Sequence, residues 1–367
     1  MPPLAHLRFP VAESLGRRFP EFPHPYRTDF QRDRDRIVHA RAFRRLEDKT
    51  QVFSPSLHDH FRNRLTHTIE VAQVSRTVAA ALGLDEDLTE ALALAHDIGH
   101  PPFAHSGEEE LDRQMQRCGE RFDHNLHSLR IVDALEQHYA RFPGLNLTFE
   151  VREGIAKHSR DFEAGEYPEL DEYLPGQRPP LEAQIIDLAD EIAYNTADLD
   201  DGFSAGFFTM EQIVEEVPHY EDLYDAVETQ FAGASRGLRF LESVRGLIDQ
   251  LVSGLLDGTI AAVRDAGVGS VAEIRAHPER LMRFTETALE TNQALKLFLR
   301  RHVYYSDVLV QERRSTAADV ARLFEYLLAN PAQVPGEDEE APHRRVCDYI
   351  AGMTDGYFRR VYAELIG

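Results

Sequence analysis

The chain has 367 residues, of which 43% are hydrophobic and 28% charged, as is ordinary for a globular protein with a large buried core. Its formal net charge of −23 repels phosphate backbones, so general nucleic-acid binding is disfavoured, although local cations can still hold a small anion. Two cysteines far apart in sequence exclude a disulfide framework. The absence of an apolar run of about 18 residues predicts a cytoplasmic protein without a membrane span.

The N-terminal segment is rich in proline, which fixes φ and lacks an N–H, so residues 1–25 are predicted to form a loosely structured arm. Apolar residues at steps of three or four then predict a helix that starts near Thr28. The other face of this helix is basic. We interpret this basic patch either as arginines in ion pairs with the many acids or as a contact for nucleotide phosphates, at the active site or at a regulatory site. The patch consists of Arg32, Arg34, Arg36, Arg41, Arg44 and Arg45.

Periodic apolar residues predict further helices along the next hundred residues. One helix is expected over residues 64–82, and the next should begin near Asp87, which fits a capping box with Glu90. Ser106 and Asp123 are each expected to cap one more helix.

Prolines and glycines break up residues 143–180, where only a short helix at about 149–159 is expected. A strong helix follows at 181–199, and the remainder is predicted to be helical as well. The stretch 331–342, rich in proline and acidic residues, is the best candidate for a linker. Because no block is rich in strands, the predicted fold class is all-α.

The most distinctive local motif is a histidine and an aspartate side by side at the end of a helix, His96-Asp97, followed by Ile98-Gly99-His100-Pro101-Pro102. Neighbours within a helix point about 100° apart and could not share one ion, whereas a helix end lets both side chains converge. An imidazole and a carboxylate suit a divalent ion such as Mn, Fe, Co, Mg or Zn. Taken alone, the pair is explained as simply by capping of the helix end.

Two other segments carry residues of the same chemistry. Arg64 and His67 lie three residues apart and share one face of the helix that they begin. Farther along, three carboxylates and a tyrosine form one stripe of an otherwise apolar helix, which indicates a polar site rather than a solvated face because a buried acidic stripe needs cations. The stripe consists of Asp187, Asp190, Tyr194 and Asp198.

The order His67, then His96-Asp97, then Asp190 resembles the metal site of the HD-domain phosphohydrolase superfamily. Several motifs resemble, more narrowly, the bacterial deoxyguanosine-triphosphate triphosphohydrolase family. These motifs are Tyr26–Ile37, Phe43–Leu46, Lys49–Phe53, Arg64–His67, His96–His105 and Asp348–Asp355. The resemblance implies an HD-domain helical bundle with additional helices. It also implies an N-terminal arm at 1–25, an HD metal phosphohydrolase core at 26–205 and a helical C-terminal part packed on the core at 206–367.

The resemblance also implies a reaction, in which a deoxynucleoside triphosphate (dNTP) is split at its α-phosphorus into deoxynucleoside and intact triphosphate. One divalent ion, Mn, Mg, Fe or Co, is expected per site. The implied metal ligands are His67, His96, Asp97 and Asp190. The implied catalytic pair is His105 and Glu108. The implied phosphate contacts are Arg64, His124 and Lys157, and the implied deoxyribose contacts are Gln51, Tyr194 and Asp198.

One departure and several open alternatives accompany this hypothesis. Guanine-selective relatives carry Lys-Tyr-Pro where this chain has Lys157-His158-Ser159, so strict selectivity for guanine is not implied. Asp187 is a candidate to orient a metal-bound imidazole, and His100, His127 and His158 could act similarly or lie at the surface. The alternative functions are another HD reaction, on a monophosphate, a cyclic dinucleotide or an alarmone, and a non-catalytic nucleotide sensor. The resemblance further implies homo-oligomers and a regulatory nucleotide as partners.

Overall fold

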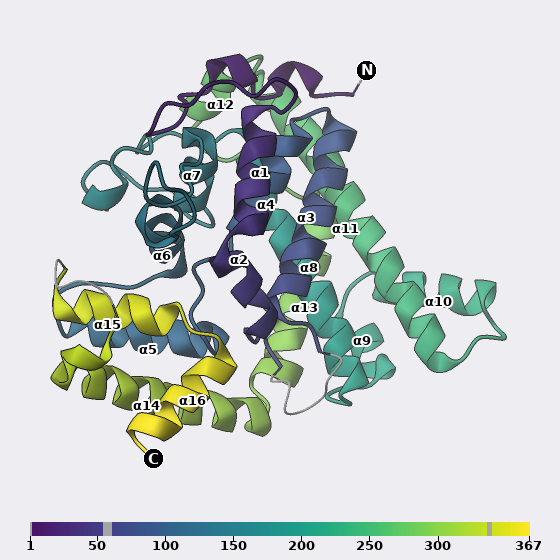
Figure 1. Ribbon diagram of the computed structural model, residues 1–367. Helices are drawn as coiled ribbons and strands as arrows, with labels where there is room; N and C mark the ends of the chain where they lie inside the picture. Colours follow the sequence, from purple (N-terminus) through teal and green to yellow (C-terminus); the bar gives the residue numbers. More distant parts are fainter. Residues whose placement is uncertain (1, 54–60, 336–339) are drawn as a thin grey trace. The chain divides into compact units, whose positions relative to one another are not determined.

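The structure is a computed structural model that describes residues 2–53, 61–335 and 340–367, and these residues form helices with no strand beyond isolated bridges (Figure 1). The predicted all-α class is therefore confirmed. The α-helices are α1 (Asp29–His39), α2 (Arg41–Arg45), α3 (Arg64–Leu82), α4 (Glu86–Ala95), α5 (Ala104–Gln116), α6 (His124–Arg130), α7 (Phe149–Ala156), α8 (Leu181–Ser204), α9 (Met210–Glu216), α10 (Tyr220–Gln230), α11 (Arg236–Ala266), α12 (Val271–Ala276), α13 (Glu286–Leu299), α14 (Asp307–Ala329), α15 (Pro342–Ala351) and α16 (Asp355–Leu365).

Short 3₁₀ or π turns connect these helices. They are η1 (Ala5–Leu7), η2 (Val11–Glu13), η3 (Leu46–Asp48), η4 (Ile131–Leu135), η5 (Pro168–Leu170), η6 (Arg300–Tyr304) and η7 (Pro331–Gln333). The chain divides into two compact units. Unit 1 comprises Met1–Glu13, Ile69–Ala93 and His158–Leu309, and unit 2 comprises Ser14–Thr68, Leu94–Lys157 and Val310–Gly367. The expected division into arm, core and C-terminal part stays a prediction.

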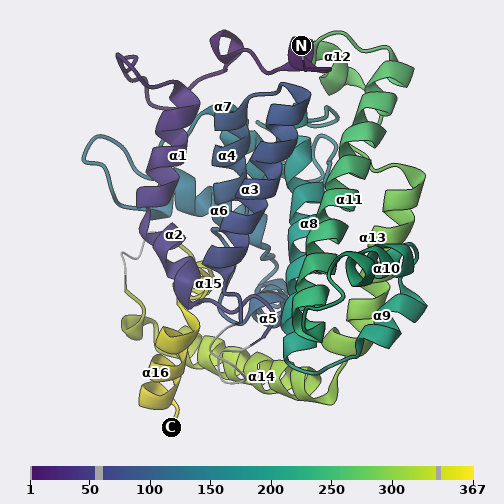
Figure 2. The ribbon, with the colours of Figure 1, turned by 90° about the vertical axis from the view of Figure 1, so that its right-hand side faces the viewer.

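Unit 1 is built around the long helices α8, α11 and α13, which pack against one another and lie side by side in Figure 2. Two glycines of α11 allow the start of α13 to approach closely. A Cβ at Gly254 would lie 2.2 Å from the Cβ of Ala288, and one at Gly258 would lie 2.4 Å from the carbonyl oxygen of Arg283. Among the described residues, α11 alone is long and apolar enough to cross a membrane, and it packs on α8, α10 and α13.

Unit 2 has a hydrophobic core that joins α5 to the C-terminal helices α14, α15 and α16, and Figure 1 shows α5 beside α15. Leu111 and Met115 of α5, Phe324 of α14 and Ile350 of α15 are buried in this core. The ring of Phe103, which precedes α5, meets Phe358 of α16 edge to face, with ring centroids 4.9 Å apart. The C-terminal helices therefore fix the position at which α5 begins.

Several helix starts confirm the sequence predictions. Thr28 caps α1 in a capping box with Gln31, α3 spans the expected residues, and Asp123 caps α6 by accepting a hydrogen bond from the backbone N of Leu126. The helix expected to continue from Thr28 is instead interrupted at Ala40, whose backbone is extended, so that α2 is a separate short helix.

Two predicted caps were wrong. Asp85, not Asp87, caps α4, because its carboxylate accepts a hydrogen bond from the backbone N of Leu88 at 2.9 Å. Ser106 lies inside the first turn of α5, where its hydroxyl donates to the carbonyl oxygen of Phe103 at 2.7 Å. The linker predicted at 331–342 includes residues 336–339, which lie outside the described residues.

The N-terminal segment is not the loosely structured arm that its prolines predicted. In unit 1, the backbone N of Phe9 donates to the buried carboxylate of Glu182 at 2.8 Å. In unit 2, Ser14 donates to Glu150 at 2.6 Å, and Arg17 pairs with the buried carboxylate of Asp33. Buried carboxylates thus bind the polar groups of this segment, and proline composition does not predict such partners.

Candidate metal centre and its surroundings

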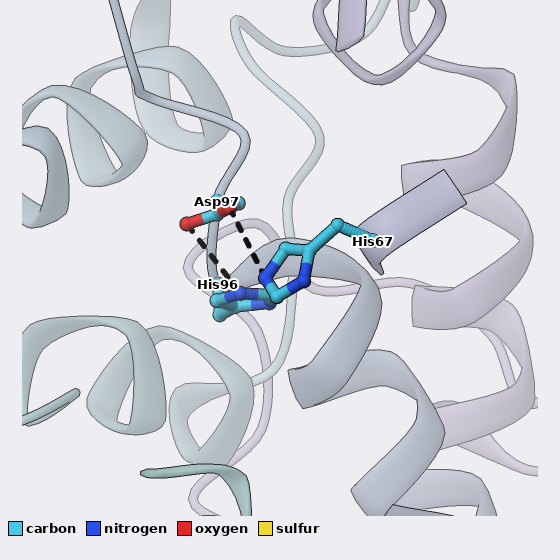
Figure 3. A group of neighbouring side chains, drawn as sticks. All are labelled: His67, His96 and Asp97. Atoms are coloured by element: carbon cyan, nitrogen blue, oxygen red, sulfur yellow. Dashed lines mark ion pairs between the residues drawn. The ribbon is translucent and has the colours of Figure 1, made fainter. Parts of the chain in front are cut away.

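Two imidazoles and one carboxylate converge in unit 2, where Figure 3 shows His67, His96 and Asp97 pointing toward one another. His67 lies in the first turn of α3, and His96 and Asp97 directly follow the last residue of α4. Asp97 is 3.9 Å from His67, measured from Oδ2 to Nε2, and 3.4 Å from His96, measured from Oδ1 to Nε2. The chain turn after α4 therefore lets adjacent side chains face the same point, as the sequence predicted.

The donor set of this cluster fits a divalent metal ion. The ligand atoms of His67, His96 and Asp97 all lie within 4.8 Å of one another, and all three residues are buried. Imidazole nitrogens and a carboxylate oxygen are typical ligands of Mn, Fe, Co and Zn. Asp190, the fourth residue that the sequence suggested, belongs to unit 1, where it lies on α8.

Asp97 is the electrostatic centre of this cluster. Burial alone would raise its pKa, but the imidazoles of His100 and His96 and the guanidinium of Arg64 outweigh burial and hold the pKa well below its usual value. Arg64 donates to Oδ2 of Asp97 at 2.7 Å and is itself buried. Nδ1 of His100 lies 2.9 Å from Oδ1, and burial lowers the pKa of His100 well below its usual value. Asp97 is therefore ionised and can bind a cation.

The first residues of α5 include His105 and Glu108, the catalytic pair that the resemblance implies, and a tight turn precedes them. Phe103 and Ala104 both adopt left-handed conformations, with φ of 63° and 53°. Near the start of α5, Glu108 faces two imidazoles at different distances. Its carboxylate is 2.7 Å from Nδ1 of His124 and also accepts from the backbone N of His124 at 2.8 Å. Nδ1 of His105 is 3.7 Å away, and the His105 side chain is 77% exposed.

Glu108 is strongly acidic in this arrangement. Burial would raise its pKa, but the neighbouring imidazoles, His124 foremost and then His105 and His100, outweigh burial and hold the pKa well below its usual value. The ring of His124 also stacks on His100, with centroids 3.8 Å apart. The described geometry therefore joins Glu108 to His124 more closely than to His105.

Lys49 and Asp355 hold the turn before α5 by its backbone. The ammonium of Lys49 donates to the carbonyl oxygens of His100, at 2.5 Å, and Ala351, at 3.1 Å. Burial, aided by nearby arginines, lowers the pKa of Lys49 to about 7. The carboxylate of Asp355 accepts from the backbone N of Phe103 at 3.1 Å and from the backbone N and hydroxyl of Thr50. Asp355 thus binds one end of the turn that precedes α5, and Lys49 joins the other end to Ala351.

The acidic stripe of α8 lies in unit 1, where Asp198 is buried and the other three residues are half-buried. The hydroxyl of Tyr304 donates to the carboxylate of Asp198. Burial raises the pKa of Tyr194, and the carboxylates of Glu191, Asp190 and Asp198 raise it further, so this phenol stays neutral. Tyr194 and Asp198 follow Asp190 by one and two turns on one helix face. The stripe is therefore a polar face of carboxylates and one neutral phenol.

The remaining predicted site residues have these surroundings. The side-chain oxygen of Gln51 is buried and has no hydrogen-bond partner among the described residues. Lys157, at the end of α7, is buried and pairs with Glu153 at 2.9 Å. His127 is buried and faces Asp348, with Nδ1 and Oδ1 3.3 Å apart. Among the described residues, nothing donates a hydrogen bond to the buried oxygen of Gln51.

Arginines at the start of the predicted basic patch form ion pairs, as the first of its two interpretations expects. Arg32 pairs with Glu21 and Asp29, and Arg36 pairs with Glu21 at 2.6 Å. The phosphate-binding interpretation of the patch stays a prediction.

No pattern in the sequence singles out Tyr304, and Lys49 and Asp355 stand inside motifs that imply no role for them. Asp198 and its partner Tyr304 are 106 residues apart, and Lys49 and Ala351 are 302 residues apart. No local pattern reports such contacts, so only the motif resemblance at 49–53 and 348–355 drew attention to the second pair.

Two family models match this chain and define the class of protein to which it belongs. The HD domain family model matches residues 64–195, and the phosphohydrolase-associated domain model matches residues 282–364. The chain is thus a hydrolase of the HD phosphohydrolase class. It is similar to proteins named deoxyguanosinetriphosphate triphosphohydrolase-like protein, from three bacteria among others.

The relative from Azoarcus sp. (strain BH72) is 44% identical, over 99% of this chain and 96% of the relative. That from Geobacter sulfurreducens is 42% identical, over 95% and 92%. That from Ralstonia nicotianae is 44% identical, over 96% and 93%. The chain belongs to the deoxyguanosinetriphosphate triphosphohydrolase-like family, as its motifs suggested.

Proposed function

We propose that this protein hydrolyses deoxynucleoside triphosphates to deoxynucleoside and inorganic triphosphate, with dGTP and other dNTPs as substrates. The observation that carries the proposal is the buried cluster of His67, His96 and Asp97 within the segment matched by the HD domain. The names of the relatives support a triphosphate substrate. We further propose that the enzyme is cytoplasmic, assembles as a homo-oligomer and responds to a regulatory nucleotide, as the resemblance implies.

His67, His96 and Asp97 would hold one divalent ion, Mn, Mg, Fe or Co, and Asp190 would be the fourth ligand. Two neutral imidazoles and two carboxylates leave a divalent ion formally uncharged. When bound, the ion would withdraw charge from the α-phosphoryl oxygens and acidify water. The ionised state of Asp97 supports this assignment.

Cations of the chain would bind the triphosphate, whose charge builds up when it leaves. Arg64 is proposed for this task because it is buried beside Asp97. Lys157 is proposed as a second cation, for which it would exchange Glu153 for phosphate oxygens. The sugar would lie against Gln51, Tyr194 and Asp198, with Asp198 accepting from the 3′-hydroxyl. The side-chain oxygen of Gln51 has no partner among the described residues, which supports its proposed role as an acceptor.

A histidine would carry the proton to the leaving deoxynucleoside, with Glu108 orienting its ring. The sequence resemblance assigns this role to His105. A second candidate is His124, favoured by its 2.7 Å contact with Glu108, against 3.7 Å for His105. In the second assignment, His105 at the exposed start of α5 would contact phosphate oxygens.

The test is to incubate the protein with each dNTP and with GTP, in the presence of Mn²⁺ or Mg²⁺, and to separate the products. Triphosphate should appear in equal amount to deoxynucleoside, and ¹⁸O from water should enter the triphosphate. His96→Ala with Asp97→Ala should abolish activity, whereas His39→Ala, at an exposed histidine of α1, should not. Release of phosphate, pyrophosphate or a linear nucleotide would assign another HD reaction, and no turnover of any nucleotide would favour a sensor.

A further inference from the structure

His158 contacts Asp187, which is paired with Arg280, and the proposed reaction gives this arrangement no role. It follows α7, and the next residue, Ser159, has a left-handed conformation with φ of 55°. Nδ1 of His158 lies 2.7 Å from Oδ1 of Asp187, and the backbone N of Ser159 donates to the same oxygen at 2.9 Å. Asp187 thus fixes both the turn and the orientation of the ring.

Asp187 is itself held on its other side. Its second oxygen, Oδ2, pairs with Arg280, which also donates to Asp161 at 3.1 Å and to the carbonyl oxygen of Arg160 at 2.6 Å. Burial would raise the pKa of Asp187, but His158 and Arg280 outweigh burial and lower it. The carboxylate is therefore ionised, and His158 is backed by a fixed negative charge.

Another neighbour of His158 is the proposed ligand Asp190. Asp187 and Asp190 are three residues apart on α8 and so share one face of the helix. A ligand nitrogen of His158 and a carboxylate oxygen of Asp190 lie within 4.8 Å of each other, close enough to share an ion. Metal-bound histidines usually donate their other ring N–H to a carboxylate, which fixes the tautomer and makes the ligand nitrogen more basic.

We propose that His158 is a further metal ligand, whose Nε2 binds the same ion as Asp190, with Asp187 and Arg280 as its positioning residues. The inference rests on the proposed metal site, to which it adds one imidazole ligand. The contacts that support it all lie within unit 1. The competing explanation is that the Arg280–Asp187–His158 chain only locks the turn after α7. A second competitor is that His158 contacts nucleotide phosphates and not the metal.

Two substitutions separate the two ring nitrogens. His158→Asn keeps an amide N–H near the position of Nδ1, so the hydrogen bond to Asp187 is retained while Nε2 is lost. His158→Gln places its amide near the position of Nε2 instead. Asp187→Asn keeps the ring but removes the charge behind it. The matched control is His302→Ala, because His302 pairs with Glu216 at 2.7 Å and Glu216 pairs with Arg301, which reproduces the arginine, carboxylate and histidine chain elsewhere in unit 1.

The measurement is Mn²⁺ binding to the metal-free full-length variants by titration calorimetry, without nucleotide. His158→Asn should weaken Mn²⁺ binding at least ~10-fold, and Asp187→Asn should weaken it by ~10–100-fold, as loss of an orienting partner does. His302→Ala should bind as the unmodified chain does. Electron spin-echo modulation of the bound Mn²⁺ should show one fewer coordinated nitrogen in His158→Asn and His158→Gln.

Unchanged Mn²⁺ affinity with an unchanged nitrogen signal in His158→Asn would overturn the proposal. A raised KM for the nucleotide with unchanged Mn²⁺ binding would assign His158 to the phosphates instead. Melting temperatures of the same variants identify a purely structural role, which would lower the stability of Asp187→Asn while its Mn²⁺ affinity and the nitrogen count of His158→Asn stay unchanged. Because these readouts need no turnover, they stay decisive even if the chain hydrolyses a different nucleotide.

Discussion

The partner of Glu108 can be identified by a double-mutant cycle. Glu108→Gln keeps a side-chain oxygen for the backbone N of His124 but removes the carboxylate charge. It would be combined in turn with His124→Ala and with His105→Ala. The reaction rate then measures how strongly each imidazole depends on the carboxylate, because the cycle cancels what each substitution does alone.

The distances set the expected magnitudes. Glu108 and His124 form a 2.7 Å contact in a mostly buried setting, and a hydrogen bond to a charged group is worth about 1.5–3 kcal/mol, which is roughly 10–150-fold in rate. The pair with His105 is 3.7 Å long and has an exposed partner, so its coupling should stay below about 1 kcal/mol, or roughly 5-fold. Loss of the proton carrier alone should lower kcat by ~10²–10⁴-fold.

The assay is kcat for dNTP hydrolysis by all five variants and the unmodified chain, with metal content and melting temperature measured on the same samples. Glu108→Gln should lower kcat in the unmodified background and change it little once His124 is alanine. In the His105→Ala background, the effect of Glu108→Gln should be nearly unchanged. If the coupling lies with His105 and the His124 cycle is additive, the assignment drawn from the distances is refuted.

Three further outcomes follow from the described contacts. Burial raises the pKa of Glu182 from 4.5 to about 7, so its contribution to stability is complete below pH 4.5 and is lost as pH rises through 7. Urea unfolding against pH should show a loss of about 3 kcal/mol that Glu182→Gln removes. Asp355→Asn should lower kcat at least ~10-fold at unchanged metal content, because Phe103 and Thr50 together need both carboxylate oxygens. Tyr304→Phe should cost about 1–3 kcal/mol of unfolding free energy, measured by denaturant titration, because buried Asp198 loses a donor.

The sequence predicted features that depend on near neighbours along the chain. Helix α3 begins and ends where its apolar period does, and His96-Asp97 converge because a helix end frees the backbone. The capping residues were harder to predict, because Asp85 and Asp87 are both acids within two residues of the start of α4. Asp85 is the cap because its backbone N donates to the buried carboxylate of Glu182, which is 97 residues away in sequence.

Contacts between distant segments account for what the sequence could not give. Asp187 was suspected of orienting an imidazole, but its partner Arg280 is 93 residues away in a region without recognisable motifs. The resemblance implies a phosphate contact for His124 because this histidine stands at a matching position in the motif order. Its contact with Glu108 depends on how α5 and α6 pack, which the motif order does not show. Tertiary structure determines such partners, and the helical periodicity of the sequence does not predict them.

The C-terminal helices explain why the turn before α5 can exist at all. Left-handed conformations at Phe103 and Ala104 each cost roughly 1–3 kcal/mol, so the surrounding structure must stabilise them. The matched phosphohydrolase-associated segment supplies that stabilisation, through the carboxylate of Asp355 on the backbone N of Phe103 and through the carbonyl of Ala351, which Lys49 joins to His100. Residues of the HD segment thus supply the proposed metal ligands, and residues near the C-terminus set the backbone from which Glu108 reaches its imidazole. A chain without the last two helices would keep every proposed ligand and lose the geometry of that turn.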